Sequence, residues 1–339
     1  MSEKRPPREA GGSPAFSHIP VMLQEVLSGL DIRPDGIYVD GTAGGGGHSE
    51  AIAERLSDRG LLIAIDRDGD AVRAASARLE RFGSRARVVH ANYADMKQVC
   101  AEFGVQSIDG FLMDLGVSSY QLDNPERGFS YMSDAPLSMR MDPTEERSAR
   151  EIVNGYSGEE LTRILRDWGE ERFAGRIAAE ICRRRSAKPI ETTLELVDAV
   201  AAAIPPGGRP SKHHFAMRTF QAIRIEVNRE IEIIPESLRE AVGLLNPGGR
   251  GAVITFHSVE DRAVKETFAE LAAGCVCPKD LPVCVCGRRP EIKLLTKKPL
   301  TPGAAELAEN SRSHSAKLRL IEKTKDTKEQ PFFRPGNPG

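Results

Sequence analysis

The chain has 339 residues, a formal net charge of −2, and 40% apolar and 28% charged residues. This length suits one large domain or two modest ones, and the composition is ordinary for a soluble globular protein. No apolar run approaches the roughly 20 residues that cross a membrane, and residues 1–17 lack the apolar core of a signal peptide. We therefore predict a cytoplasmic protein with disordered tails at residues 1–17 and 324–339. Contacts with nucleic acid would have to come from a local basic surface.

After an amphipathic helix at residues 21–30, the chain carries a glycine-rich loop between a strand and a helix. Residues 37–39 are apolar and end in Asp40, and five glycines follow within residues 41–47. Residues 49–56 have the apolar spacing of a helix. Glycine lacks the Cβ that would keep a ligand away from the backbone, and a sharp turn needs only one or two glycines. We predict a ligand-binding loop.

The second strand indicates which ligand this loop holds. Residues 61–65 are apolar and end in Asp66, a position suited to accept hydrogen bonds from ribose hydroxyls. The dinucleotide fingerprint requires a third glycine where this chain has Ser49. In addition, Asp40 would repel a pyrophosphate but tolerate a sulfonium or ammonium group. These features together favour S-adenosylmethionine.

Two more strands are predicted to reach the same crevice. Residues 87–90 form the third strand, and Tyr93 beyond it either flanks an adenine or lies on the surface in a turn. Residues 108–113 form the fourth strand and end in Asp114. Ligands lie at the carboxyl ends of parallel strands, so Asp114 should point to the ligand. A helix N-cap is the alternative, but no clear helix follows at once.

After residue 123 the strand–helix alternation stops. An irregular segment leads into helical stretches at residues 148–154, 158–168, 171–185 and 193–203. We predict an inserted all-α domain at residues 124–228, between two parts of one α/β domain at residues 18–123 and 229–323.

The end of this insertion is basic. From Arg176 to Arg229 there are ten Lys or Arg and five Asp or Glu. Aromatic residues and histidines alternate with the cations Lys212, Arg218 and Arg224. Such a pattern suits phosphate neutralisation and base stacking, and a solvated helical face is the alternative. We predict an RNA-binding surface.

The last part resumes the sheet. We expect a helix at residues 232–245, a turn at 246–250 and a fifth strand at 251–256. The fifth strand ends in His257, which is either a catalytic group beside Asp114 or a packing residue. A helix at residues 259–273 and an antiparallel pair of strands complete the prediction, and the two strands are placed at residues 292–296 and 316–321.

Four of the six cysteines lie within twelve residues, at Cys275, Cys277, Cys284 and Cys286. Six cysteines in a cytosolic chain favour thiols or metal ligands over disulfides. The spacing is Cys-x-Cys twice instead of the usual Cys-x₂-Cys of zinc sites. A structural zinc loop and a reduced loop of small residues therefore both remain open.

Several segments resemble the bacterial ribosomal small-subunit RNA methyltransferase H family, namely residues 18–22, 40–48, 64–68, 114–123, 127–130, 218–222 and 256–258. The resemblance spans residues 18–323. It implies a class I S-adenosylmethionine-dependent methyltransferase (Rossmann-like) sheet with an inserted all-α substrate-recognition domain. It also implies methylation of N4 of a cytosine in the decoding region of 16S rRNA. By position, the cofactor contacts would be Gly46, Gly47, His48, Asp66, Tyr93, Asp114 and Gln121. Family members without the four-cysteine loop exist, so a metal there would not be catalytic.

The residues are compatible with this chemistry. Methylation of C5 of a pyrimidine needs a cysteine nucleophile, and neither residues 114–118 nor residues 255–259 contain one. An exocyclic amine needs only alignment and a hydrogen-bond acceptor, for which Asp114 and His257 are the candidates. The target cytosine must also leave its stack, and the inserted domain could assist this. The chain has Asp114-Leu115-Gly116-Val117 where many amine methyltransferases carry Asp/Asn-Pro-Pro-aromatic, so the identity of the proton acceptor stays open.

Two other classes of function are considered. A nicotinamide oxidoreductase would need the missing third loop glycine. A non-catalytic ribosome-binding or assembly factor would keep the basic surface but would not need Asp66 and Asp114 beside an intact glycine loop.

Overall fold

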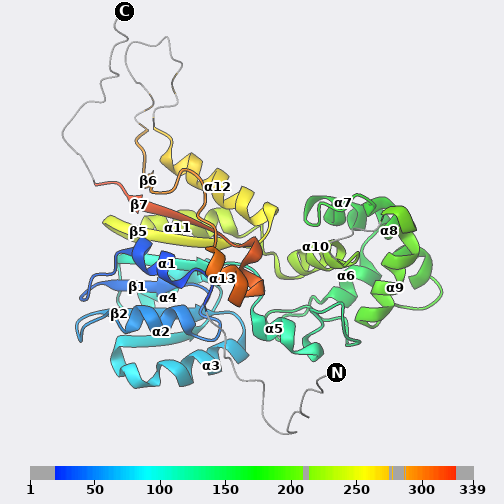
Figure 1. Ribbon diagram of the computed structural model, residues 1–339, viewed down its shortest axis with the longest axis horizontal. Coiled ribbons are helices and arrows are strands. Elements are labelled where there is room, and N and C mark those ends of the chain that lie inside the picture. The colour runs from blue at the N-terminus through cyan, green and yellow to red at the C-terminus, as the bar shows by residue number, and fades with distance from the viewer. Residues whose placement is uncertain (1–19, 209–213, 275–276, 278–285, 287, 326–339) are drawn as a thin grey trace, which may run out of the picture. The chain divides into compact units, whose positions relative to one another are not determined.

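The structure, a computed structural model, describes residues 20–208, 214–274, 277, 286 and 288–325. These residues form two compact units (Figure 1). The sheet unit comprises the described residues within 19–116, 141–144 and 228–325. The helical unit comprises those within Val117–Arg140 and Glu145–Val227.

The sheet unit is built on one seven-stranded sheet of order β3-β2-β1-β4-β5-β7-β6. Its strands are β1 (Ile37–Asp40), β2 (Leu61–Asp66), β3 (Ala86–His90), β4 (Ile108–Asp114), β5 (Leu245–Thr255), β6 (Ile292–Leu294) and β7 (Lys317–Lys323). Strands β1 to β5 are parallel, whereas β7 runs antiparallel to β5 and β6 antiparallel to β7. The predicted α/β sheet with a final antiparallel pair is confirmed.

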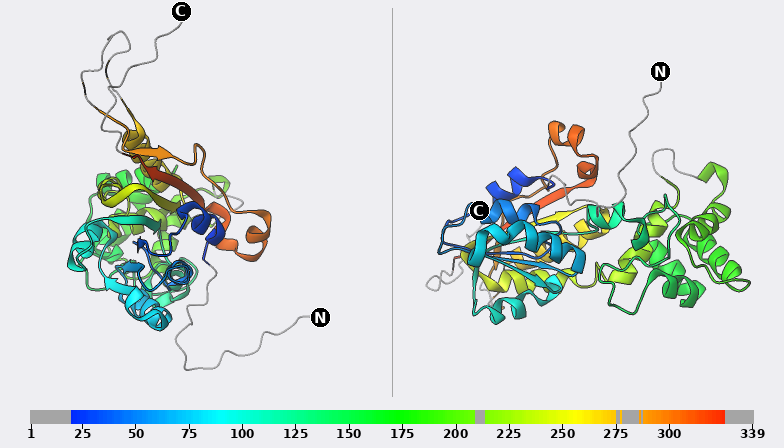
Figure 2. Two further views of the ribbon diagram at one scale, coloured as in Figure 1. Left: turned by 90° about the vertical axis from the view of Figure 1, so that its left-hand side faces the viewer. Right: turned by 90° about the horizontal axis from the view of Figure 1, so that it is seen from below.

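Helices cover both faces of this sheet (Figures 1 and 2). One face carries α1 (Leu23–Leu30), α2 (Gly47–Ala53) and α3 (Gly69–Leu79), and the other carries α4 (Met96–Glu102), α11 (Ile234–Leu244) and α12 (Ser258–Ala272). The short helix α13 (Ala304–Glu309) lies between β6 and β7 in sequence. Because the parallel strands are covered on both faces, they are apolar without alternation, as in Leu62 to Ile65, which are all 0% exposed. Burying each such Leu or Ile contributes about 1.5–3 kcal/mol.

Strand β5 differs from the sequence prediction. It begins at Leu245, so the turn predicted at residues 246–250 lies inside the strand. Leu245 pairs with Ile108 and Arg250 pairs with Gly110, and the register shifts between these two pairs. Gly248, with φ of +80°, makes the irregularity possible. The Pro-Gly-Gly segment predicted as a turn before the strand is therefore an irregularity within it.

The helical unit contains α5 (Ser119–Asp123), α6 (Ala149–Gly155), α7 (Gly158–Asp167), α8 (Ala174–Arg185), α9 (Thr193–Ala203) and most of α10 (Met217–Asn228). The four helices predicted between residues 148 and 203 are all present. Three of them begin with a Ser or Thr N-cap and a Glu three residues later, and each pair forms a reciprocal capping box. Short 3-10 helices lie at Glu80–Arg85, Tyr93–Asp95, Pro125–Arg127, Pro206–Gly208 and Ser311–Ser315.

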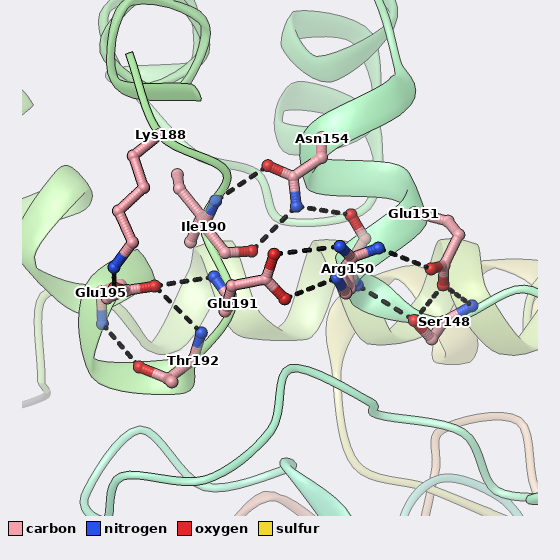
Figure 3. A network of polar contacts seen from close by, with 9 residues as sticks. All are labelled: Ser148, Arg150, Glu151, Asn154, Lys188, Ile190, Glu191, Thr192 and Glu195. Atoms are coloured by element: carbon pink, nitrogen blue, oxygen red, sulfur yellow. Dashed lines mark hydrogen bonds and ion pairs between the residues drawn. The ribbon is translucent and has the colours of Figure 1, made fainter. Parts of the chain in front are cut away.

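Polar contacts tie these helices together (Figure 3). The Arg150 guanidinium donates two hydrogen bonds to Glu191, of 2.6 and 2.9 Å. Lys188 donates to Glu195 at 2.7 Å, and the Asn154 side chain both donates to and accepts from the backbone of Ile190. Lys188, a cation of the predicted basic segment, is therefore neutralised within the unit.

One buried carboxylate joins α10 to α7. Glu226 is 7% exposed and accepts hydrogen bonds from Trp168 Nε1 at 2.8 Å and from the Tyr156 hydroxyl at 3.0 Å. Arg147 donates to the Glu226 carbonyl at 2.8 Å.

Among the described residues, no helix is both long enough and apolar enough to cross a bilayer.

Candidate active site

Three aspartates end three neighbouring strands of the sheet unit: Asp40 on β1, Asp66 on β2 and Asp114 on β4. Carboxyl ends of parallel strands meet at one edge, so these carboxyl groups share one site. Asp40 is fully buried and accepts hydrogen bonds from the Ser49 hydroxyl at 2.6 Å and from the Thr42 N–H at 3.1 Å. Burial raises the pKa of Asp40 to about 6, although both hydrogen bonds oppose the shift. Ser49, where the dinucleotide fingerprint has glycine, therefore anchors Asp40.

Asp66 ties the glycine loop to the end of β2. Its carboxylate accepts the Gly44 N–H at 2.7 Å and the Asp68 N–H at 2.8 Å. Burial raises the pKa of Asp66 to about 6, and the negative charges of Asp68 and Asp40 add to the shift. Asp66 thus holds the loop in place, in addition to any role toward a ribose.

The loop glycines serve different purposes. Gly44 has φ of +51°, and a Cβ there would meet nothing closer than the Thr42 carbonyl oxygen at 4.0 Å. A Cβ on Gly46 would lie 3.2 Å from Ala75 Cα, and one on Gly47 would lie 2.6 Å from Pro20 Cγ. Gly46 and Gly47 are therefore required by close packing within the protein. The sequence argument took the five glycines together as a ligand loop; of Gly44, Gly46 and Gly47, only Gly44 has open space where a Cβ would stand.

Asp114 provides a buried acceptor without a donor. Its backbone N–H donates to Thr42 Oγ1 at 2.6 Å, whereas its Oδ1 atom is buried and has no hydrogen-bond partner among the described residues. Burial raises the pKa of Asp114 to about 8, and the negative charges of Asp40 and Glu260 add to the shift. An unsatisfied buried acceptor costs about 1–3 kcal/mol, which a ligand with a suitable donor would recover. The N-cap alternative is wrong, because Ser118 caps α5.

His48, in the first turn of α2, lies beside this carboxyl group, with Nε2 3.8 Å from Asp114 Oδ2. The side chain is buried, and burial lowers the pKa of His48 to about 4, partly opposed by the Val21 carbonyl. At neutral pH the imidazole is therefore uncharged, and its contact with Asp114 is not an ion pair. Helix α2 contains no Lys or Arg whose positive charge could offset the negative charges of the three aspartates.

Tyr93 packs against the start of the glycine loop. Its Cβ lies 3.0 Å from the position that a Cβ on Gly41 would take, and its hydroxyl donates to the Glu230 carbonyl at 3.5 Å. Burial raises the pKa of Tyr93. The ring is half-buried beside the loop and is not a surface side chain in a turn, while its contact with an adenine remains a prediction.

His257 is the N-cap of α12. Its Nδ1 accepts the Glu260 N–H at 3.3 Å, and Glu260 Oε2 accepts the Phe256 and His257 N–H groups at 2.8 and 3.3 Å. The second ring nitrogen, Nε2, lies 2.9 Å from Glu260 Oε1. Both ring nitrogens therefore face the glutamate of the same helix. Glu260, only 1% exposed, escaped the sequence analysis, although the spacing of His257 and Glu260 is that of a capping box.

The remaining predicted site residues belong to the helical unit or lie outside the described residues. Gln121 forms a capping box with Ser118, whose N–H it accepts at 2.9 Å. Arg218 is exposed and donates to the Glu170 carbonyl at 2.8 Å, and Arg224 is partly buried. Lys212 lies outside the described residues.

Cys277 and Cys286 are described, but Cys275 and Cys284 are not. Within the described part of the chain, no group of three or more His, Cys, Asp or Glu side chains is arranged to hold a metal ion. The zinc loop and the reduced loop therefore both stay predictions.

The sheet order, its antiparallel β7 and the carboxyl groups at the ends of β1, β2 and β4 define a class I S-adenosylmethionine-dependent methyltransferase fold. The site fits that cofactor, because Asp66 can accept from hydroxyls, the unsatisfied Asp114 Oδ1 can accept from a cationic donor, and Gly44 leaves its side of the loop open.

Comparisons identify the family. Residues 15–324 match the MraW methylase family. Ribosomal RNA small subunit methyltransferase H of Geobacter sp. (strain M21) is 53% identical over 91% of this chain and 99% of its own, and the protein of that name from Clostridioides difficile (strain 630) is 51% identical over the same shares. A solved rRNA methylase from Streptococcus thermophilus aligns with a TM-score of 0.41 and 13% identity, over 91% of this chain and 100% of that one. The chain belongs to the MraW methylase family and is an S-adenosylmethionine-dependent rRNA methyltransferase. This membership excludes the oxidoreductase and the non-catalytic factor.

Proposed function

We propose that this protein transfers a methyl group to the exocyclic N4 of a cytosine in the decoding region of 16S rRNA, acting in the cytoplasm on the rRNA or on the small subunit. The observation that carries the proposal is Asp114 Oδ1 at the end of β4, a buried acceptor that has no donor among the residues that the structure describes. The described ends of β4 and β5 hold no thiol that could add to C6 of a pyrimidine. An amine needs an acceptor there and no covalent intermediate.

When bound, S-adenosylmethionine supplies an electrophilic methyl group. In this proposal Asp66 accepts from ribose hydroxyls, and Tyr93 lies against the adenine. Gly46, Gly47 and His48 line the remainder of the cofactor site, with Asp114 and Gln121 as further contacts. The backbone hydrogen bonds to Asp66 and Asp40 support this arrangement, since they fix both carboxyl groups before a ligand arrives.

In this proposal Asp114, at the end of β4, accepts the proton that the N4 amine loses. A base for this proton need not be strong, because the amine becomes acidic only as the new bond forms. His257 orients the end of β5 through its cap on α12. Its Nε2 lies 2.9 Å from Glu260 Oε1 but has no hydrogen-bond partner among the described residues, so His257 stays a second candidate for the relay. We therefore assign the acceptor role to Asp114 first.

We assign RNA recognition to the inserted domain at residues 124–228, with Lys212, Arg218 and Arg224 on phosphates. Arg218 is the best supported of the three, since it is exposed and, among the described residues, its guanidinium contacts a carbonyl oxygen and no carboxylate. Arg183 and Arg184, by contrast, are paired with Glu180 at 2.7 and 2.8 Å.

The test is nucleoside mass spectrometry of 16S rRNA from cells with and without the gene, with fragment mapping to locate the change. We expect N4-methylcytidine to disappear from one decoding-region fragment and to return when purified protein and S-adenosylmethionine are added. Loss of 5-methylcytidine, or loss of a methyl group elsewhere in the rRNA, would refute the proposal.

A further inference from the structure

Three aromatic rings form a stack in the helical unit. His214 stacks on Tyr131 with a centroid distance of 4.6 Å and an interplanar angle of 9°, and on Phe215 at 4.4 Å and 29°. Two rings cannot share one face of an imidazole at these distances, so His214 lies between the other two. Tyr131 comes from the irregular segment after α5, and the other two rings immediately precede α10. The fold thus joins two segments that the sequence analysis had treated separately.

The stack is anchored at one end. Phe220, on the first turns of α10 and only 3% exposed, meets the Tyr131 ring edge-on at 5.7 Å and 84°. Tyr131, His214 and Phe215 themselves are only partly buried, and the neighbouring Met132 is 72% exposed. Three stacked rings held this way at the surface bury less apolar area than the same rings would in the core. Packing alone therefore gives a weak reason for their arrangement.

The chemistry of the stack suits an uncharged planar ligand. The Ala216 N–H donates to His214 Nδ1 at 3.3 Å, so the proton of the imidazole is on Nε2, and burial lowers the pKa of His214. The ring is therefore neutral at physiological pH. Arg218, exposed in the first turn of α10, supplies positive charge close by in sequence, and the exposed Asp134 accepts the Leu194 N–H of α9 at 3.4 Å. An aromatic stack next to an exposed arginine is how single-stranded RNA is bound.

We propose that Tyr131, His214 and Phe215 form a stacking platform for an unpaired base of the rRNA substrate, with Arg218 on an adjacent phosphate. This inference rests on the proposed function for the RNA but not on which nucleotide is methylated. A protein surface of the small subunit is the alternative occupant, and the test distinguishes the two.

The first measurement is binding of a protein-free 16S rRNA fragment to Phe215→Leu and Tyr131→Leu, which keep apolar volume but remove the aromatic face. We expect each to weaken binding by about 5-fold or more, since stacking of a base on an aromatic ring is worth about 1–3 kcal/mol. The dependence of affinity on salt should stay the same, because no phosphate contact is lost. Phe103→Leu is the matched control, an aromatic 41% exposed in the sheet unit. Unchanged S-adenosylmethionine affinity in each variant verifies that the protein is folded.

The second measurement is photocrosslinking of the same fragment carrying 5-bromouridine, followed by mass spectrometry of the tryptic peptides. We expect crosslinks in the peptides that contain Tyr131 or Phe215, whatever nucleotide the enzyme methylates. Wild-type RNA affinity in both leucine variants, with crosslinks confined to other peptides, overturns the proposal. So does a defect seen only with assembled subunits, which would assign the stack to a ribosomal protein.

Discussion

Asp114 shows how burial and function are linked in a single residue. Its carboxyl group lies near Asp40 and Glu260, and its imidazole neighbour His48 is uncharged at neutral pH. The free protein therefore holds Asp114 largely protonated at pH 7, as the pKa of about 8 requires. A cationic ligand favours the ionised form, so binding must remove the proton.

Cofactor binding should consequently depend on pH. Below the Asp114 pKa of about 8, we expect S-adenosylmethionine affinity to rise about tenfold per pH unit and to level off above it, with about one proton released per cofactor bound at pH 7. Calorimetry in buffers of different ionisation enthalpy, from pH 6.5 to 9, measures both quantities. S-adenosylhomocysteine, whose sulfur carries no charge, should show a smaller dependence, and so should Asp114→Asn. An affinity for S-adenosylmethionine that does not change over this range contradicts the argument.

The same carboxyl group should destabilise the free protein at high pH. Folding raises its pKa from about 3.9 to about 8, so the native state favours the protonated form, and stability is lost as pH rises from about 4 through 8. Asp114→Asn does not titrate. We expect its stability advantage over the wild type to grow by about 1.4 kcal/mol per pH unit between pH 5 and pH 8. Urea denaturation at the two pH values checks this.

That variant should also lose turnover well beyond any loss of RNA affinity, a trade of activity for stability. If Asp114→Asn is instead less stable than the wild type at pH 8, the carboxyl group is satisfied in the folded protein. Wild-type turnover at saturating cofactor and RNA would remove Asp114 from the catalytic mechanism.

At the scale of single elements, His257 has two possible roles that can be tested separately: it caps helix α12, and its imidazole is a candidate for the proton relay. Loss of an N-cap costs about 0.5–2 kcal/mol, so His257→Ala should reduce stability by about 1 kcal/mol. His257→Asn restores a good cap without an imidazole. We expect this variant to recover both stability and most of the turnover, because the hydrogen bond that His257 makes to Glu260 is the cap itself, through Nδ1. Thermal unfolding and methylation rates measure the two effects. Recovered stability without recovered turnover would show that the imidazole itself takes part in the reaction.

Elements whose signal is local were predictable from the sequence. The three Ser/Thr…Glu capping boxes begin helices α6, α7 and α9 close to where the helical spacing placed them. Asp40, Asp66 and Asp114 were placed at one edge by the strand-end rule alone. What could not be predicted depends on partners distant in sequence: the continuation of β5 through Gly248, the packing of Pro20 on Gly47, and the joining of Tyr131 to His214. Glu260 is the exception, since its spacing from His257 was readable and was overlooked.

At the scale of the whole molecule, acidic and basic residues are concentrated in different places, one for binding the cofactor and the other for binding RNA. The net charge is only −2, and the cofactor site in the sheet unit is acidic. Several arginines and lysines of the helical unit form ion pairs with carboxylates of the same unit, as Arg150 does with Glu191 and Lys188 with Glu195 (Figure 3). A count of basic residues therefore overstates the surface available to phosphates.

This difference predicts which arginine contributes to RNA binding. Arg218→Ala should reduce the slope of log affinity against log salt by about one unit, the value for one lost phosphate contact. Arg183→Ala is the matched control, because that guanidinium is already paired with Glu180 at 2.7 Å, and it should leave the slope unchanged. Both slopes come from filter binding of a 16S rRNA fragment between about 50 and 200 mM salt. Equal slopes for Arg218→Ala and the wild type would place the phosphate contacts on other cations, and equal losses in both variants would mean that the ion pairs of α8 open when RNA binds.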